Sequence, residues 1–232
     1  MTKKLHELAA TLQYEFQDEF LLRNALTHRS VGGKNNERLE FLGDSVLNFV
    51  IASELYDRYP DATEGDLSRI RASLVNKESL AKIASGIHLG DWLYLGSGEL
   101  KSGGFRRKSI LADALKAIFG ATYVDAGYNQ TRELILSLYR TLFENPVDPE
   151  ALKDPKTRLQ EWLQARKRPL PFYELVDASG KPHEQVFVIR CVVDGFEQDI
   201  VGSGKSRRKA EQQAAERALV ALSKNSGDEF SS

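Results

Sequence analysis

The feature that most constrains the fold of this chain is a change in hydrophobic periodicity near residue 150. Before it, apolar residues recur every three or four positions, as on one face of an α-helix. After it, apolar and polar residues alternate over short runs, which is typical of strands. The proline-rich segment "ENPVDPEALKDP" separates the two patterns. The sequence therefore predicts an all-α domain over residues 1–147, a linker over 148–153, an α+β domain over 154–224 and a flexible tail over 225–232.

The boundaries of the elements follow from the same pattern. In the first domain Pro60 and Gly127 end helices, and the Gly-rich segment 96–109 is predicted to be irregular. Four helices are predicted in this domain, over residues 39–59, 67–87, 111–126 and 131–143. The second domain has the predicted order α-β-β-β-α, over residues 155–166, 172–177, 184–193, 196–204 and 206–223.

Composition excludes several classes of protein. The net charge of −1 means that any binding of nucleic acid must come from local patches. The single cysteine, Cys191, excludes an internal disulfide framework, fits a reducing cytoplasm and falls on the apolar side of a predicted strand. The four histidines are scattered, so a zinc site is not expected. No segment has the length of a membrane span or the form of a signal peptide. We expect a soluble cytoplasmic protein without a membrane partner.

One predicted helix carries an unusual stripe of acidic residues. In "NNERLEFLGDSVLNFVI", Glu37, Glu40 and Asp44 have the spacing i, i+3, i+7, which places them along one face. Apolar residues occupy much of the remaining circumference, so the acids should face other protein or a cleft. Crowded carboxylates repel one another unless a cation relieves them, and Mg²⁺ prefers oxygen ligands. The alternative is a solvated acidic stripe balanced by Lys34 and Arg38.

A second helix adds one acid and one base. Asp113 and Lys116 lie three residues apart in the apolar run "ILADALKAIFG", and therefore share a helix face. A structural ion pair is the simplest interpretation. Four acids in largely apolar helices without as many bases favour a metal site instead. An all-carboxylate Mg²⁺ site suits phosphoryl chemistry, in which the metal activates water and stabilises charge on a phosphodiester.

These residues carry a family resemblance. The stretch "ERLEFLGDSVL" resembles the signature of ribonuclease III, a family of double-stranded-RNA endonucleases. The segments "ALTHRS" (25–30), "GELKSGGFRRKSILAD" (98–113) and "DPKTRLQEWLQ" (154–164) resemble further parts of the family in the expected order. The resemblance implies an all-α endonuclease domain followed by an α-β-β-β-α double-stranded-RNA-binding domain. It also implies a homodimer, and a role in the processing of ribosomal and messenger RNA in the cytoplasm.

The resemblance also implies roles for single residues. Glu40 and Asp113 would ligate Mg²⁺, with Mn²⁺ as a substitute, Asp44 would belong to the catalytic centre, and Glu37 and Glu64 would be accessory acids. The family normally has a glutamate three residues after Asp113, where this chain has Lys116. A charged ammonium has no lone pair to give to a metal and itself neutralises nearby carboxylates. We therefore expect metal binding to be weak or absent and cleavage to be impaired.

Polar and basic residues of the second domain are candidates for contacts with RNA. Thr157, Gln160 and Glu161 lie along one predicted helix, and His183 lies in a loop between two strands. A basic cluster stands at the start of the last helix, where free backbone N–H groups also favour phosphate; it comprises Lys205, Ser206, Arg207, Arg208 and Lys209. The loop of the first domain adds Lys101, Arg106, Arg107 and Lys108. Solvated surface clusters, an ordinary surface histidine and a mobile loop are the alternatives.

Two functions from different classes remain open at this point. The first is a Mg²⁺-dependent endonuclease that hydrolyses phosphodiester bonds in double-stranded RNA; the resemblance implies products with 5′-phosphate and 3′-hydroxyl ends. The second is a double-stranded-RNA-binding protein that does not cleave, which Lys116 makes realistic for this chain. Cleavage of a labelled duplex in the presence of Mg²⁺ separates the two.

Overall fold

The computed structural model describes residues 3–145, 152–180, 184–196 and 199–226. The chain divides into two compact units, residues 1–149 and 150–232. Most of the predicted linker and tail lies outside the described residues, as does His183.

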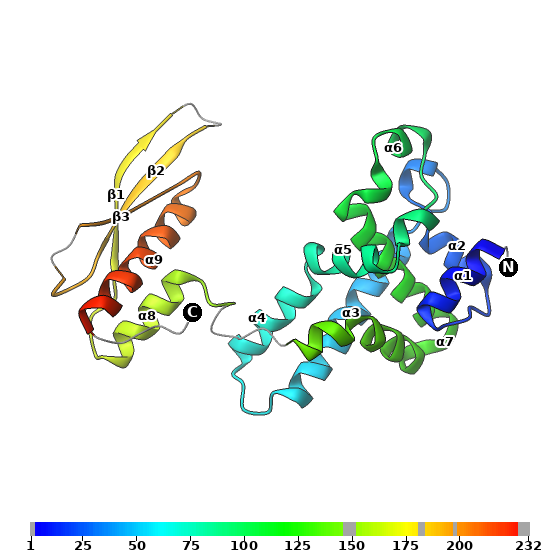
Figure 1. Cartoon of the computed structure of the whole chain (residues 1–232), viewed down its shortest axis with the longest axis horizontal. Coiled ribbons are helices and arrows are strands. Elements are labelled where there is room, and N and C mark those ends of the chain that lie inside the picture. Colours follow the sequence, from blue (N-terminus) through cyan, green and yellow to red (C-terminus); the bar gives the residue numbers. More distant parts are fainter. Residues whose placement is uncertain (1–2, 146–151, 181–183, 197–198, 227–232) are drawn as a thin grey trace. The chain divides into compact units, whose positions relative to one another are not determined.

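The first unit is all-helical, as the periodicity predicts (Figure 1). Two long helices form its centre: α3 (Glu37–Arg58) and α7 (Lys108–Glu144). Smaller helices surround them: α1 (Lys3–Leu12), α2 (Glu19–Ala25), α4 (Glu64–Val75), α5 (Lys77–Gly86) and α6 (Ser97–Lys101), with 3₁₀ turns at Arg29–Val31, Leu89–Trp92 and Gly104–Arg106.

Two sequence-based boundaries were wrong. The predicted helix over residues 67–87 is two helices, because the backbone of Asn76 is extended and its side chain accepts a hydrogen bond from the Ser79 N–H at the start of α5. The segment 96–109, predicted to be irregular, contains α6 and a 3₁₀ turn. The predicted break at Gly127 is confirmed: this residue has φ of 76°, a left-handed value that interrupts α7.

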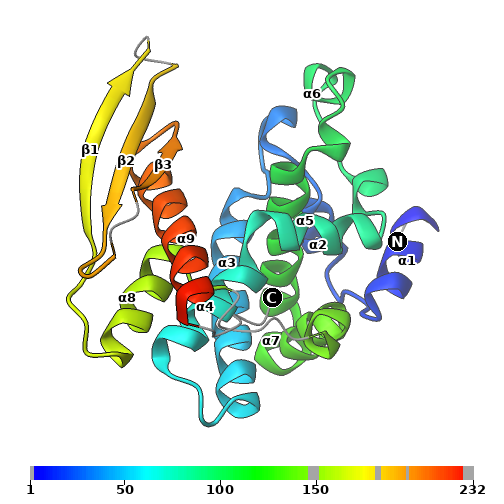
Figure 2. The same ribbon diagram turned by 60° about the vertical axis from the view of Figure 1, so that its left-hand side comes forward.

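The crossing of α3 and α7 depends on two glycines, and Figure 2 shows these helices side by side. A Cβ atom on Gly43 would lie 1.8 Å from the carbonyl oxygen of Lys116. One on Gly120 would lie 2.1 Å from the carbonyl oxygen of Leu39. Both values are far below any real contact of a Cβ atom, so only glycine permits this approach. The crossing brings the N-terminal half of α3 against the N-terminal half of α7.

The second unit has the predicted order α-β-β-β-α, and the predicted fold class is confirmed for both units. Its elements are α8 (Pro155–Ala165), β1 (Phe172–Ser179), β2 (Val186–Val192), β3 (Ile200–Gly204) and α9 (Arg207–Ser226). The strands form an antiparallel sheet in the order β1-β2-β3, with both helices against one face (Figure 1). Leu159, Trp162 and Leu163 of α8 pack with Cys191 and Leu219 in the core. Cys191 is therefore a core residue.

Candidate active site

The crossing of α3 and α7 places a cation beside one acid of the predicted stripe. The Lys116 Nζ atom lies 2.6 Å from Asp44 Oδ1, and the lysine side chain is only 20% exposed. The other oxygen of Asp44 accepts a weaker hydrogen bond from Asn48, one turn along α3. Among the described residues, the ion-pair partner of Lys116 is therefore an acid of α3, Asp44, and not its neighbour in sequence, Asp113.

The other two acids of the crossing face each other. Glu40 of α3 and Asp113 of α7 line the same cleft and lie close enough to interact. Burial raises the pKa of Glu40, and the negative charge of Asp113 raises it further, while the ammonium of Lys116 opposes the shift. The net direction is upward, because burial and the charge of Asp113 together outweigh the ammonium of Lys116.

These side chains do not form a complete metal site. Within the described ranges, no three His, Cys, Asp or Glu side chains are grouped so that they could hold a metal ion. Glu40 and Asp113 supply oxygen donors, but Asp44 is directed to Lys116. An ammonium supplies charge without a lone pair, so it cannot replace an oxygen ligand. The residues present therefore do not fit a fully coordinated Mg²⁺ or Mn²⁺.

A cleft of about 440 Å³ opens beside the two facing carboxyl groups. Glu37, the first residue of α3, also lines it and lies 3.6 Å from Arg29. Glu64 is not among the lining residues: it begins α4 and accepts a hydrogen bond from Ser68. The lining side chains belong to His28, Arg29, Ser30, Asn36, Glu37, Glu40, Glu99, Arg107, Ser109, Ile110 and Asp113. The structure thus brings Glu37, Glu40 and Asp113 together and leaves Glu64 apart from them.

One side of the cleft was not singled out from the sequence. The Ser30 hydroxyl lies 2.9 Å from His28 Nδ1 and accepts a hydrogen bond from the Gly96 N–H. The Ser30 N–H also donates to His28 Nδ1. These contacts tie the 3₁₀ turn that begins at Arg29 to the segment before α6. The motif "ALTHRS" was the available signal, but its spacing alone predicts no contact with residue 96.

The four basic residues from the end of α6 to the start of α7 have different surroundings. Arg107 pairs with Glu99 at 2.8 Å and lines the cleft. Lys108 pairs with Glu78. Arg106 lies over the ring of Phe105. Lys101 ends α6 and is exposed. These residues form no single cluster, and only Arg107 reaches the cleft.

In the second unit, the predicted residues of α8 lie near its first turns. Thr157 donates a hydrogen bond to Asp154, the N-cap residue of α8. Gln160 and Glu161 are exposed, and Glu161 pairs with Lys153 at 2.7 Å. Gln160 and Glu161 therefore lie on the surface of α8, whereas the hydroxyl of Thr157 is directed to Asp154.

The basic cluster at the start of α9 is fully on the surface. Lys205, Arg207, Arg208 and Lys209 are exposed, and the Ser206 hydroxyl accepts a hydrogen bond from the Lys209 N–H. The backbone N–H groups of the first turn point along the helix axis toward the same region. This arrangement is suited to holding phosphate groups.

Comparison with known proteins identifies the family. Residues 18–142 match the family described as Ribonuclease-III-like, and residues 155–222 match the double-stranded RNA binding motif. Ribonuclease 3 of Methylococcus capsulatus is 57% identical over 97% of this chain and 98% of its own length. The chain belongs to the ribonuclease III family. Ribonuclease 3 of Aliivibrio fischeri is 53% identical and is covered over its whole length.

Solved structures agree with this assignment for the first unit. The nuclease domain of ribonuclease III from Campylobacter jejuni is 45% identical, with a TM-score of 0.59, over 60% of this chain and 99% of that domain. The two matched regions of this ribonuclease III family member fall in its two compact units. No helix within the described residues is long and apolar enough to cross a membrane.

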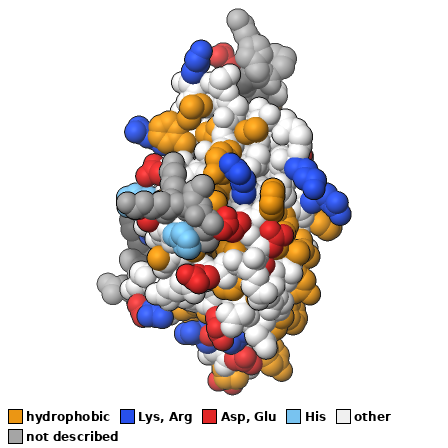
Figure 3. Space-filling model, turned by 90° about the vertical axis from the view of Figure 1, so that its right-hand side faces the viewer, with side chains coloured by type: hydrophobic (Ala, Val, Ile, Leu, Met, Phe, Trp, Pro, Cys, Tyr) orange, Lys and Arg blue, Asp and Glu red, His pale blue; other side chains and the backbone are white. Residues whose placement is uncertain are grey.

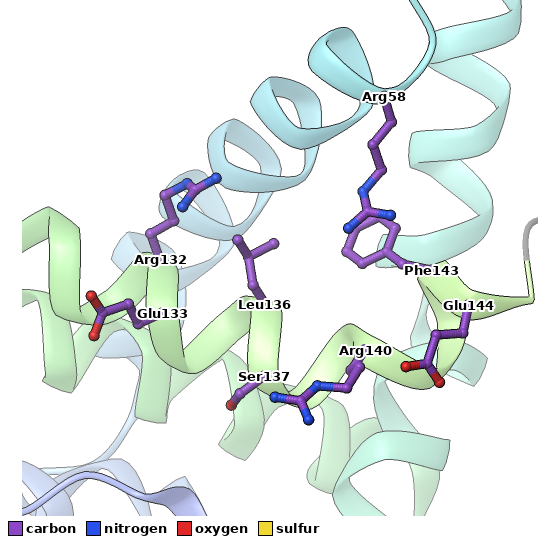
Figure 4. A pocket seen from close by; sticks show the side chains of 8 residues that line it. All are labelled: Arg58, Arg132, Glu133, Leu136, Ser137, Arg140, Phe143 and Glu144. Atoms are coloured by element: carbon purple, nitrogen blue, oxygen red, sulfur yellow. The ribbon is translucent and has the colours of Figure 1, made fainter.

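This family member has a second hollow of about 390 Å³, whose lining side chains pair with neighbouring residues and have a structural role (Figure 4). Arg58 lies over the ring of Phe143, and Arg140 lines the same hollow. Arg58 and Arg132 both pair with Glu54, at 2.7 and 3.0 Å. Two arginines that line the hollow share the carboxylate of Glu54, and these ion pairs connect the end of α3 to the second half of α7.

On the face of the molecule in Figure 3, acidic and basic side chains are interspersed.

Proposed function

We propose that this chain binds double-stranded RNA as an endonuclease of the ribonuclease III family whose cleavage centre is blocked by Lys116. The contact of 2.6 Å between Lys116 Nζ and Asp44 Oδ1 carries the proposal. Glu40 and Asp113 are the proposed metal ligands of a centre that Lys116 leaves incomplete, and Asp44 is a proposed acidic residue of the catalytic centre. Glu37 and Glu64 are proposed accessory acids, although Glu64 does not line the cleft.

The block has two physical parts. Lys116 occupies the position where the resemblance predicts a glutamate, so one oxygen ligand is missing. Its charge also satisfies Asp44, which lowers the attraction of the site for a divalent cation. A divalent metal held by Glu40, Asp113 and a carboxylate at position 116 would supply water activation and would stabilise the charge that develops on the phosphodiester. Loss of such a centre lowers cleavage by orders of magnitude.

Binding of RNA does not depend on this centre. The second unit matches the double-stranded RNA binding motif, and its basic residues 205–209 lie on the surface at the start of α9. Residues 157, 160 and 161 of α8 are the proposed contacts to the minor groove. A chain with an intact second unit and a blocked cleavage centre acts as a double-stranded-RNA-binding protein. This second candidate function is favoured by the same lysine.

The proposed assembly is a homodimer formed by the first unit. Phe41, Phe49 and Tyr56 project from α3 with 78%, 62% and 73% of their surfaces exposed, an unusual number of large apolar groups on one helix. The published description of the Campylobacter jejuni nuclease domain refers to a region involved in dimer formation. A two-fold dimer presents one cleavage centre to each strand of a duplex.

The test compares three proteins: the chain itself, Lys116→Glu and Lys116→Gln. Cleavage of a labelled RNA duplex is measured with and without Mg²⁺, and metal binding is measured by calorimetry. Lys116→Glu should gain at least about 100-fold in cleavage rate and should bind Mg²⁺ more tightly. Lys116→Gln removes the ammonium without adding a carboxylate, so it should remain slow.

Two outcomes contradict the proposal. Fast Mg²⁺-dependent cleavage by the Lys116 chain would show that the lysine does not block the centre. An inactive Lys116→Glu protein that still binds duplex RNA would show that residue 116 is not a ligand position. Duplex affinity, measured in EDTA, should be nearly equal for the three proteins.

A further inference from the structure

One acidic residue stands inside the proposed phosphate-binding surface of the second unit. Glu211 lies one turn after Arg207 in α9, and its side chain is only 14% exposed. Its Oε1 atom lies 3.1 Å from Arg207 Nε, and its Oε2 atom lies 2.7 Å from Lys156 Nζ. Lys156 belongs to α8, so one carboxylate joins cations from both helices of the unit.

Lys156 is held from a second direction. Its Nζ atom lies 4.5 Å from the centre of the ring of Tyr173 in β1, which is a cation–π contact. Its backbone N–H donates to the N-cap side chain of Asp154. Because Lys156 is fixed at its backbone and at its ammonium group, Glu211 is attached through it to the first turn of α8.

The contact to Arg207 uses only one edge of the guanidinium. The Nε atom donates to Glu211, and among the described residues neither Nη atom has a hydrogen bond or ion pair. The guanidinium group carries five N–H donors in a rigid plane. Fixing the Nε edge therefore sets the direction of the Nη donors, which remain available for a phosphate oxygen.

Glu211 remains charged in these surroundings. Burial alone would raise its pKa, but the hydrogen bonds and charges of Lys156 and Arg207 outweigh burial and lower the pKa below its usual value. In the first unit Glu54 likewise pairs with two cations, Arg58 and Arg132, but there both arginines line the second hollow.

We propose that Glu211 is a positioning residue for RNA binding: it orients the guanidinium of Arg207 toward a phosphate of the duplex and fixes α9 to α8 through Lys156. This inference rests on the proposed binding of duplex RNA by the second unit. Preorganising a long side chain before binding avoids the entropy cost of ordering it in the complex.

The direction in which one substitution changes the affinity for RNA distinguishes this role from simple electrostatic repulsion. Removing a negative charge from a phosphate-binding surface should strengthen the binding of RNA if the charge only repels phosphate. If Glu211 orients Arg207, Glu211→Gln should instead weaken binding, by roughly three- to tenfold for one disordered side chain. The neutral amide keeps the size of the side chain and loses its charge.

The matched control is Glu216→Gln, the same chemical change on the exposed side of the same helix. Affinity of the full chain for a duplex of arbitrary sequence is measured in EDTA over a range of salt concentrations. Glu216→Gln should bind as tightly as the parent or slightly more tightly. Arg207→Ala should reduce the slope of log affinity against log salt by about one.

The combination of Glu211→Gln with Arg207→Ala excludes a mere defect of folding. Without a guanidinium to orient, Glu211→Gln should lose most of its effect on affinity, and the part that remains reports the contact with Lys156, whereas a misfolded unit would lose affinity equally in either background. Glu211→Gln binding as tightly as the parent, or more tightly, would overturn this inference and leave the proposed function intact. A parent chain that fails to bind duplex RNA would overturn the proposed function itself.

Discussion

The substitution Gly43→Ala tests the crossing of α3 and α7, on which the geometry of the candidate active site depends. A Cβ atom at this position would lie 1.8 Å from the carbonyl oxygen of Lys116 and 2.8 Å from the backbone nitrogen of Gly120. Both neighbours are backbone atoms of a buried helix, so neither can rotate away as a side chain would. The helices must separate locally by roughly 1 Å to relieve the overlap.

The expected cost follows from that displacement. Overpacking of a closely packed core costs about 1–3 kcal/mol, and a clash between two helix backbones belongs at the upper end of this range. For a unit of this size the melting temperature should fall by roughly 5–10 °C. A displacement of about 1 Å should also lower cleavage by roughly 100-fold in the active background Lys116→Glu.

The assay is thermal unfolding of the full chain, followed by far-ultraviolet circular dichroism, because most of the helical residues lie in the first unit. Gly86→Ala is the matched control: it makes the same chemical change in the last position of α5, where no atom lies within 4 Å of the added Cβ atom. This control should be neutral or stabilising by up to about 1 kcal/mol. If Gly43→Ala melts at the same temperature as the parent chain, the inferred contact between the two helix backbones is wrong.

Three further predictions follow from the first unit. Because burial and the charge of Asp113 raise the pKa of Glu40, its contribution to stability is complete below about pH 4 and is lost as pH rises through the raised pKa. Glu40→Gln should therefore raise the free energy of unfolding at neutral pH by less than about 1 kcal/mol in this partly exposed site, seen as a higher melting temperature, and this gain should vanish in acid. Glu54→Gln should cost about 1–2 kcal/mol in urea unfolding, since it weakens two charge-assisted contacts, whereas the exposed Glu133→Gln should be neutral. Light scattering of the full chain should give twice the monomer mass, and Phe41→Glu should give the monomer; a monomeric parent chain at micromolar concentration would contradict the proposed dimer.

Much of this architecture follows from local sequence. The order of helices and strands depends on periodicity, on Gly127 and on the prolines near residue 150, all of which act on the neighbouring backbone. The burial of Cys191 follows from alternation along a single strand. The split at Asn76 was missed because the apolar pattern continues across it, while capping of α5 by its side chain decides the boundary.

The tertiary structure decided which distant side chains meet. Spacing along α3 and α7 predicts that four acids and one lysine lie on two helix faces. It does not predict that Lys116 pairs with Asp44 or that Glu40 lies near Asp113. That choice depends on the angle and distance of a crossing between segments about seventy residues apart, which Gly43 and Gly120 permit. Glu211 is a comparable case: spacing along α9 predicts that it lies one turn from Arg207, and only the packing of α8 against α9 supplies Lys156 as its second partner. Local spacing determines which side chains share one face of a helix, and packing between segments determines which charges neutralise one another.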